Sequence, residues 1–304
     1  MDIAIMIEGQ DGLNWPRWQK LARLVENLGF AGLYRSDHFT NPSLPDKDSL
    51  ELWTSLTWLA SHTRRIEFGP LVTPMSFRHP VHTARMAAAV DDLSGGRLTL
   101  GVGAGWQERE HRIFGFDLLD RQARFERFEE GLLVIMSLLK RDMAVDFEGK
   151  YYHLDGALLM PAPQRPGGPR LLIGGNGETR TMVLAARYAD EWNALWIPVK
   201  EWQRLNAHLD AMLKELGRPP EAVCRSMMTG VRFGRSLKEL NDKLAKEGRT
   251  REDLRKEGVI VGVGEEVRQQ LDELAKAGLQ RVMLQWLELD NLAGLRALAK
   301  AVIG

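Results

Sequence analysis

The sequence predicts an α/β fold, and within that class a (β/α)8 barrel that forms one domain over residues 1–304. Eight short apolar segments alternate with segments of helical periodicity along the whole chain. No linker or change of composition divides the chain, and 304 residues lie within the range of one such barrel. A doubly wound sheet shares this alternation, but the count of eight strands favours the barrel.

The eight predicted strands are short runs of mostly apolar residues. In chain order they are Ile3–Ile7, Gly32–Ser36, Ile66–Thr73, Leu98–Ala104, Leu171–Gly174, Trp192–Ile197, Ser226–Phe233 and Val282–Leu287.

The predicted helices carry start and stop signals. Asn14 and Pro16 begin the first helix and Gly29 ends it. The other predicted helices are Leu50–His62, Pro80–Leu93, a long charged region that ends near Arg141, and Leu292–Val302.

Two segments depart from the plain repeat. Residues 142–169 contain Phe147–Tyr152 (FEGKYY) and then several prolines and glycines, which predicts a hairpin and a loop inserted before the fifth strand. Lys238–Glu257 is a highly charged helical segment between the seventh strand and the last repeat.

Composition restricts the class of function. Lys plus Arg and Asp plus Glu both number 41, so the chain lacks the basic excess expected of a nucleic-acid-binding or membrane-surface protein. The single cysteine, Cys224, excludes an intramolecular disulfide and a cysteine-cluster metal site. The chain enters a strand pattern at Asp2 without a signal peptide, and no apolar run approaches membrane-spanning length. We therefore expect a cytoplasmic protein that acts on a small molecule, with no nucleic-acid or membrane partner.

The end of the second strand, Ser36–Phe39 (SDHF), places a carboxylate next to an imidazole. Catalytic groups of a parallel barrel lie on the loops after the C-terminal strand ends. Histidine titrates near neutral pH and a neighbouring charge sets its protonation, so Asp37 and His38 suit proton handling. The structural alternative is that Asp37 caps the loop and His38 makes an ordinary hydrogen bond.

The loop after the third strand holds an H-x-x-H pattern at His79 and His82. No third ligand lies nearby, and Pro80 is expected to begin a helix between them. A complete site usually needs at least three protein ligands, so no metal site is predicted.

The fourth strand runs into Gly101–Trp106 (GVGAGW). These glycines are similar to a dinucleotide fingerprint, but the third comes one residue early, and Glu108 and Glu110 stand where a pyrophosphate would need a bare helix N-terminus. We interpret the segment as a strand end that lets a flat ring cofactor approach the backbone, with Trp106 beside it.

The fifth strand runs into Gly174–Thr181 (GGNGETRT). Glycines between a strand and a helix expose backbone N–H groups at a positive helix end, which is typical of a phosphate site. Arg180 and the threonines favour an anion there, whereas Glu178 opposes one. A tight turn with a capped helix is the alternative.

Taken together, these motifs resemble the luciferase-like monooxygenase superfamily, and more closely its branch of oxidoreductases that use the deazaflavin coenzyme F420. The matching segments span almost the whole chain and are Ser36–Phe39, Gly69–Pro80, Leu93–Gly115, Leu172–Thr181 and Ala189–Asn193. The resemblance implies a TIM barrel of the bacterial-luciferase type, a flavin-type cofactor and hydride chemistry.

The resemblance also implies roles for individual residues. His38 would lie close to the reactive ring with Asp37 at the same strand end, and these two are the catalytic candidates. The third strand would carry a bulge with a non-proline cis peptide that supports the ring, for which Leu71–Val72 is the matching pair, and the glycine turn would hold the cofactor phosphate. The cofactor-binding candidates are Leu71, Val72, Thr73, Gly105, Trp106, Gly174, Gly175, Asn176, Gly177, Thr179 and Arg180.

Position 106 differs from the pattern of the sugar-phosphate dehydrogenases of this superfamily. In these enzymes, a glutamate that serves as acid follows the fourth-strand glycines. Trp106 stands there in this chain, with Glu108 two residues on. A sugar-phosphate activity is therefore not expected, and the proton donor stays unassigned.

The leading hypothesis is an oxidoreductase that moves a hydride between C5 of F420 and an organic substrate, because the cofactor carries the hard chemistry and the protein positions it. One alternative is an FMN-dependent monooxygenase that activates oxygen in the same cleft. The other is a flavin-binding protein without turnover, which would be expected to have lost the Asp37–His38 pair.

We also expect a homodimer. The resemblance implies that barrels pair through helices of the early repeats, and those helices carry the large side chains Trp18, Trp53, Trp58 and Met86. The alternative is that all four pack inward.

Overall fold

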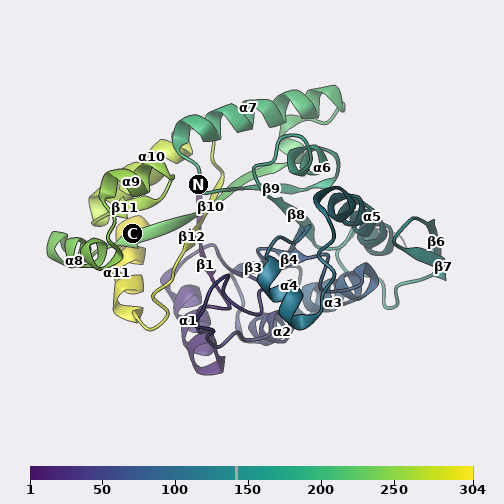
Figure 1. Cartoon of the computed structure of the whole chain (residues 1–304), viewed down its shortest axis with the longest axis horizontal. Helices are drawn as coiled ribbons and strands as arrows, with labels where there is room; N and C mark the ends of the chain where they lie inside the picture. The colour runs from purple at the N-terminus through teal and green to yellow at the C-terminus, as the bar shows by residue number, and fades with distance from the viewer. Residues whose placement is uncertain (141–142, 304) are drawn as a thin grey trace.

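The computed structural model describes residues 1–140 and 143–303 (Figure 1). Its main sheet is a parallel barrel in the order β3-β2-β1-β12-β10-β9-β8-β5-β4. The strands are β1 (Asp2–Ile7), β2 (Gly32–Arg35), β3 (Glu67–Pro70), β4 (Thr73–Pro74), β5 (Thr99–Gly103), β8 (Arg170–Gly174), β9 (Glu191–Leu195), β10 (Cys224–Phe233) and β12 (Arg281–Gln285).

The barrel closes through its third strand. β3 and β4 are the two halves of the predicted strand Ile66–Thr73, separated by Leu71 and Val72. β4 pairs with β5, and a parallel bridge between Phe68 and Leu98 joins β3 to the residue just before β5. The two ends of the sheet order therefore meet, which confirms the predicted (β/α)8 barrel. The predicted non-proline cis peptide is present between Leu71 and Val72.

The helices surround the barrel in Figure 1, with α1 to α3 on one side and α8 to α11 on another. They are α1 (Trp15–Leu28), α2 (Leu52–His62), α3 (Pro80–Ser94), α4 (Glu108–Phe114), α5 (Arg121–Lys140), α6 (Thr181–Tyr188), α7 (Val199–Glu215), α8 (Leu237–Glu247), α9 (Arg251–Lys256), α10 (Gly264–Lys276) and α11 (Leu292–Val302). The predicted signals act as expected on α1, where the Asn14 side chain accepts from the Arg17 amide and Gly29 ends the helix at φ 90°.

The predicted hairpin before the fifth barrel strand is present as β6 (Val145–Glu148) and β7 (His153–Ala157). It lies beside α5 at the edge of the molecule (Figure 1). The Glu130 carboxylate of α5 accepts from the amides of Lys150 and Tyr151, at 3.0 and 2.8 Å, and so holds the hairpin turn. Residues 141 and 142, where the long helical region was predicted to end and the insertion to begin, lie outside the described residues.

One short strand was not predicted. β11 (Ile260–Gly262) pairs with the C-terminal end of β10, beyond the part of β10 that contacts β9 and β12. Three residues are too few to show a strand period in the sequence.

Two apolar layers hold the fold together. A large one lies between the sheet and the helices, and a smaller one fills the barrel interior with Ala4, Met6, Tyr34, Leu71, Leu172, Met228 and Met283. Below the smaller layer, Arg281 contacts the Tyr34 hydroxyl at 2.9 Å, Glu67 at 2.6 Å and Glu191 at 3.2 Å. This buried charged cluster sits at the N-terminal end of the barrel, so the opposite end is left for a cavity. None of the helices in the described part of the chain combines the length and apolar composition needed to span a membrane.

Candidate active site

A cavity of about 410 Å³ opens at the C-terminal ends of the barrel strands. Its lining is mostly apolar. The lining residues are Met6, Glu8, Ser36, His38, Leu71, Val72, Pro74, Gly103, Ala104, Gly105, Trp106, Phe125, Phe128, Gly174, Thr181, Asn193, Leu195, Trp196 and Met228. A concave apolar site with a few polar groups at this end of a barrel is the expected place for a ligand. Of the predicted site residues, it brings together His38, Leu71, Val72, Gly105, Trp106 and Gly174.

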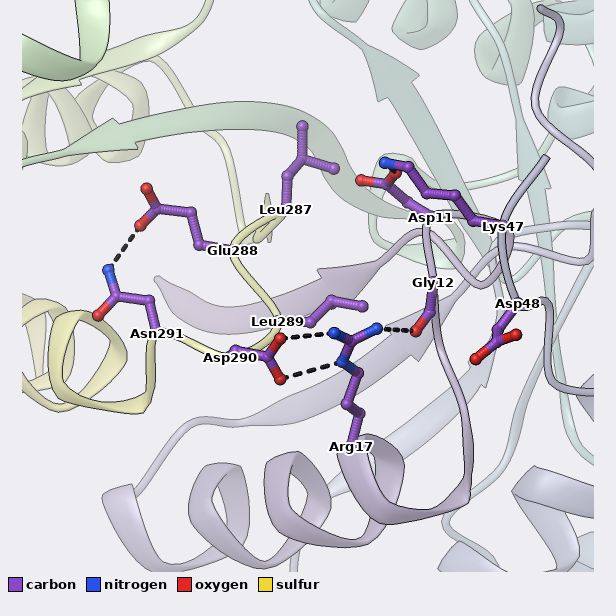
Figure 2. Close-up of a pocket in the computed structure, with 10 residues that line it drawn as sticks. All are labelled: Asp11, Gly12, Arg17, Lys47, Asp48, Leu287, Glu288, Leu289, Asp290 and Asn291. Atoms are coloured by element: carbon purple, nitrogen blue, oxygen red, sulfur yellow. Dashed lines mark hydrogen bonds and ion pairs between the residues drawn. The ribbon is translucent and has the colours of Figure 1, made fainter. Parts of the chain in front are cut away.

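A second hollow, of about 630 Å³, lies between the loops that follow β1, β2 and β12 (Figure 2). Its charged side chains neutralise one another. Arg17 makes two contacts to Asp290, at 2.6 and 3.0 Å, and Lys47 pairs with Asp11. Because these cations already have partners and no histidine lines the hollow, we assign the chemistry to the smaller cavity.

His38 has a buried acidic partner. Its Nδ1 lies 2.8 Å from Oε1 of Glu110 on α4, and Oε2 of Glu110 accepts from the Phe39 amide at 2.9 Å. Burial by itself would lower the pKa of His38, but the hydrogen bond and charge of Glu110 outweigh it, so this pKa lies above the ordinary value of 6.5. Glu110 therefore favours the charged form of the imidazole, with Nδ1 held by Glu110 and Nε2 left for the cavity.

Asp37 does not serve as the partner of the imidazole. Its carboxylate accepts from the Thr73 hydroxyl at 2.7 Å and from the Arg78 guanidinium at 2.5 Å. Side chains alternate along an extended segment, so sequence neighbours face opposite sides. Asp37 therefore ties the end of β2 to β4. The same bond occupies Thr73, which is buried and does not line the cavity.

The glycines of β5 leave space for the residues between β3 and β4. A Cβ on Gly103 would lie 2.7 Å from Cγ2 of Val72, and one on Gly101 would lie 3.2 Å from Cγ1 of Val72 and 2.1 Å from the Pro70 carbonyl oxygen. Gly174 of β8 is also close, since its Cβ would lie 3.4 Å from Val72 Cγ1. Gly103 thus makes room for Val72, and Gly101 for the Pro70 carbonyl and Val72. Val72 lines the cavity together with Gly103, Ala104 and Gly105 of the strand end.

Trp106 lies at the cavity mouth. It is 60% exposed, and its ring stands edge-on to His38 with 5.6 Å between ring centroids. The carbonyl oxygen of Gly105 accepts from Arg124 at 3.0 Å, which holds the turn before α4. An exposed indole beside a buried imidazole leaves a large apolar surface available to a ligand.

The turn after β8 has free backbone donors. The amides of residues 176–180 donate no hydrogen bond within the part of the chain that the structure describes. The Asn176 side chain bonds both the amide and the carbonyl of Leu195, at 2.9 and 2.7 Å, and so fixes the turn against β9. Glu178, which opposed an anion in the sequence, is paired with Arg204 at 2.9 and 3.0 Å. The turn therefore offers N–H groups without a facing carboxylate.

The side chains of Thr179 and Arg180, two of the predicted cofactor-binding residues, do not line the cavity. Thr179 and Arg180 line a separate groove between α5 and α6, where the Arg180 guanidinium lies 5.4 Å from the Phe125 ring and donates to the Arg121 carbonyl at 2.9 Å. Gly175 and Gly177 pack against the Thr181 side chain, and Thr181 itself reaches the cavity. Arg180 stays part of the wall between α5 and α6.

Several cavity residues were not predicted. Glu8 follows β1 directly, so the rule that strand ends carry the chemistry could have found it. Glu110 is 72 residues from His38, and no spacing pattern connects them. Asn193 and Met228 lie on β9 and β10 and were not among the site candidates, although Asn193 belongs to the matching segment Ala189–Asn193. Trp196, just after β9, is one of the tryptophans that the sequence places near a strand end.

Comparison with known proteins identifies the family that the chain matches. A family model described as luciferase-like monooxygenase matches residues 4–247. The chain is 33% identical over 181 residues to 4-hydroxyprotoasukamycin monooxygenase of Streptomyces nodosus subsp. asukaensis, which covers 59% of this chain and 47% of that protein. It is 31% identical over 157 residues to F420-dependent glucose-6-phosphate dehydrogenase of Kineococcus radiotolerans, with 51% and 46% covered. The matches thus span about half the length of these curated relatives.

A solved structure has the same fold over nearly the whole chain. An F420-dependent secondary alcohol dehydrogenase in complex with an F420–acetone adduct superposes with a TM-score of 0.87. It shares 18% sequence identity, and the superposition covers 99% of this chain and 98% of that one.

Proposed function

Since the chain belongs to the luciferase-like monooxygenase family, we propose that it is an oxidoreductase that transfers a hydride between coenzyme F420 and an apolar organic substrate. The observation that carries the proposal is the His38–Glu110 pair, which faces an apolar cavity at the C-terminal end of the barrel. Hydride transfer to or from a carbon that bears oxygen requires a proton at that oxygen, and His38 Nε2 is placed to exchange it.

The residues present fit a deazaflavin cofactor. Leu71 and Val72 form an apolar surface for the ring, and the unbonded amides of residues 176–180 suit its phosphate. When bound, F420 accepts or supplies the hydride at C5. The chain's own contribution is to hold the ring on Val72, to exclude water with Phe125 and Trp106, and to hold the proton on His38 through Glu110.

We prefer F420 to FMN as the cofactor because a named relative, a glucose-6-phosphate dehydrogenase, and the superposed secondary alcohol dehydrogenase are both F420-dependent. The FMN-dependent monooxygenase stays as the second candidate, because a named relative is a monooxygenase.

Binding titrations of the purified protein with F420 and with FMN test the proposal. We expect F420 to bind more tightly, and a preference for FMN would overturn the cofactor assignment. Gly177→Asp places a carboxylate in the turn and should weaken F420 binding tenfold or more, since like charges repel in a partly dry site. Gly264→Asp, at the start of α10 and without a left-handed φ, is the matched control and should leave binding unchanged.

We also propose a homodimer, on a smaller surface than the sequence indicated. Trp18 and Trp53 pack into the core, at 0% and 4% exposure, whereas Trp58 and Met86 are only partly buried. Trp58 stacks on His62 with 4.0 Å between ring centroids and meets Trp15 edge-on, which gives α1 and α2 an aromatic outer face. The cytoplasmic location stays a prediction from the sequence.

A further inference from the structure

The cavity holds one acidic side chain whose use is not yet explained. Glu8 follows β1, and it and His38 are the two ionisable residues among those that line the cavity in the described chain. His38 is paired with Glu110, so the Glu8 carboxylate has no charged partner among the lining residues. The buried Arg35 guanidinium interacts with the charge of Glu8, but it does not line the cavity. It donates its hydrogen bonds to the Ser36, Glu51 and Leu50 carbonyls and the Ser55 hydroxyl.

Two amides hold this carboxylate in place. Gln285 Nε2 donates to Glu8 Oε1 at 2.6 Å, and Gln10 Nε2 donates to Glu8 Oε2 at 2.9 Å. Both glutamines are buried, and both partners are neutral. A carboxylate offers about four acceptor positions, so two amide bonds leave acceptor capacity toward the cavity.

The orientation of one amide is fixed by a further bond. The Ser36 hydroxyl donates to Gln10 Oε1 at 2.7 Å and accepts from the Gly9 amide at 2.8 Å, so the NH₂ group of Gln10 must face Glu8. The chain thus builds a rigid acceptor from four residues after β1, β2 and β12. A rigid, oriented acceptor is the kind of group that fixes a ligand donor.

Glu8 lies across the barrel from the free amides that follow β8, because four steps of the strand order separate β1 from β8. Leu71 and Val72, between β3 and β4, are two steps from β1 and share an apolar cluster with Met6. A wall of the cavity is formed by Glu8 together with Met6 of β1, Trp196 just after β9 and Met228 of β10. A substrate between the ring and this wall would meet apolar side chains and one carboxylate.

We propose that Glu8 selects the substrate: it accepts a hydrogen bond from a hydroxyl or ammonium group of a molecule with an apolar body, and it rejects carboxylates and phosphates. The inference rests on the proposed function in one respect, namely that the wall with Glu8 faces the substrate. Its physical basis is that an anion beside Glu8 would meet a like charge, and that the one lining group that can carry a positive charge, His38, is already paired with Glu110. A donor group would instead complete the hydrogen bonds of the Glu8 carboxylate.

The test uses three probes of one shape, benzylamine, benzyl alcohol and benzoate, measured by calorimetric titration against the whole protein with and without F420. The wild-type protein should bind benzylamine and benzyl alcohol at least tenfold more tightly than benzoate. Glu8→Gln removes the charge and keeps the shape, and it should reduce the benzylamine-to-benzoate ratio at least tenfold. Glu108→Gln, an exposed acid on α4 that does not line the cavity, should leave the ratio unchanged.

The variant has room to form its hydrogen bonds. Gln285 Oε1 is buried without a partner, so the Gln285 amide can turn over to accept from the new NH₂ group. A wild-type preference for benzoate, or the same ratio in Glu8→Gln as in the wild type, would overturn the inference. The ratio depends on Glu8 and not on turnover, so it can hold where F420 fails to bind, and it can fail where F420 binds.

Discussion

Glu110→Gln is the change that separates a functional His38–Glu110 pair from a structural one. The substitution keeps the shape and leaves one oxygen to accept from the Phe39 amide, so an NH₂ group replaces the charged acceptor that faces His38 Nδ1. The pKa of His38 should therefore fall, because burial, which lowers it, no longer meets the opposing charge.

The expected loss of unfolding free energy in Glu110→Gln follows from the burial of the pair. The side chains of His38 and Glu110 are 14% and 1% exposed, so water screens their interaction little. A hydrogen bond between charged groups contributes about 1.5–3 kcal/mol, and we expect the variant to lose this much free energy of unfolding where His38 is charged. A group whose pKa is raised by folding contributes its stability in full below the unfolded value of about 6.5, and the contribution is lost as pH rises through the folded pKa.

The assay is urea unfolding of the wild type and Glu110→Gln at about pH 5.5 and about pH 8.5, either side of the ordinary histidine pKa. The difference in unfolding free energy should be larger at the lower pH. In single-turnover oxidation of reduced F420, the rate of the variant should decline at a lower pH than that of the wild type. Glu108→Gln is the control for a general charge effect on α4. An equal loss of stability at both pH values, with an unchanged pH profile, would refute the reasoning.

Three further predictions follow. His38→Ala should lower the hydride-transfer rate by about 10²–10⁴-fold, the usual size of acid–base catalysis, while F420 affinity measured by titration changes little; an unchanged rate would leave His38 a structural residue. Gly103→Ala places a Cβ 2.7 Å from Val72 and should cost about 1–3 kcal/mol in urea unfolding and weaken F420 binding, whereas adding Val72→Ala should recover part of the stability. Trp58→Glu should convert the dimer to a monomer in light scattering, and a wild-type protein that is already monomeric at micromolar concentration would contradict the proposed homodimer.

Local patterns were sufficient for most of the fold. α11 was predicted and is observed over Leu292–Val302, because its apolar stripe and its Asn291 cap lie within one segment. The eight barrel strands were recognised for the same reason, since each is a short apolar run between turn residues. β11 was not predicted, because its three residues form a strand only by pairing with the end of β10.

The rule that catalytic groups of a parallel barrel follow the C-terminal strand ends identified part of the site. It placed His38, Trp106 and Gly174 at one end of the barrel, because all strands of a parallel barrel end on the same face. The rule could not predict which side chain is the hydrogen-bond partner of His38. Asp37 was chosen as the neighbour of His38 along the chain, although extended backbone turns adjacent side chains apart, and Glu110 reaches the imidazole only through the packing of α4 over the barrel.

The glycines of β5 show why sequence patterns cannot identify partners in space. A glycine in the sequence shows that a side chain is absent there, but the group that occupies the free space belongs to another strand. At Gly103 that group is Val72, and at Gly101 it is the Pro70 carbonyl together with Val72, both next to the break between β3 and β4. A cofactor or a neighbouring residue would require the same glycines, and the packing of the closed barrel distinguishes them. Because Val72 lines the cavity beside these glycines, a larger or smaller side chain at position 72 should change the depth of the cavity, and on the proposed function it should change cofactor binding.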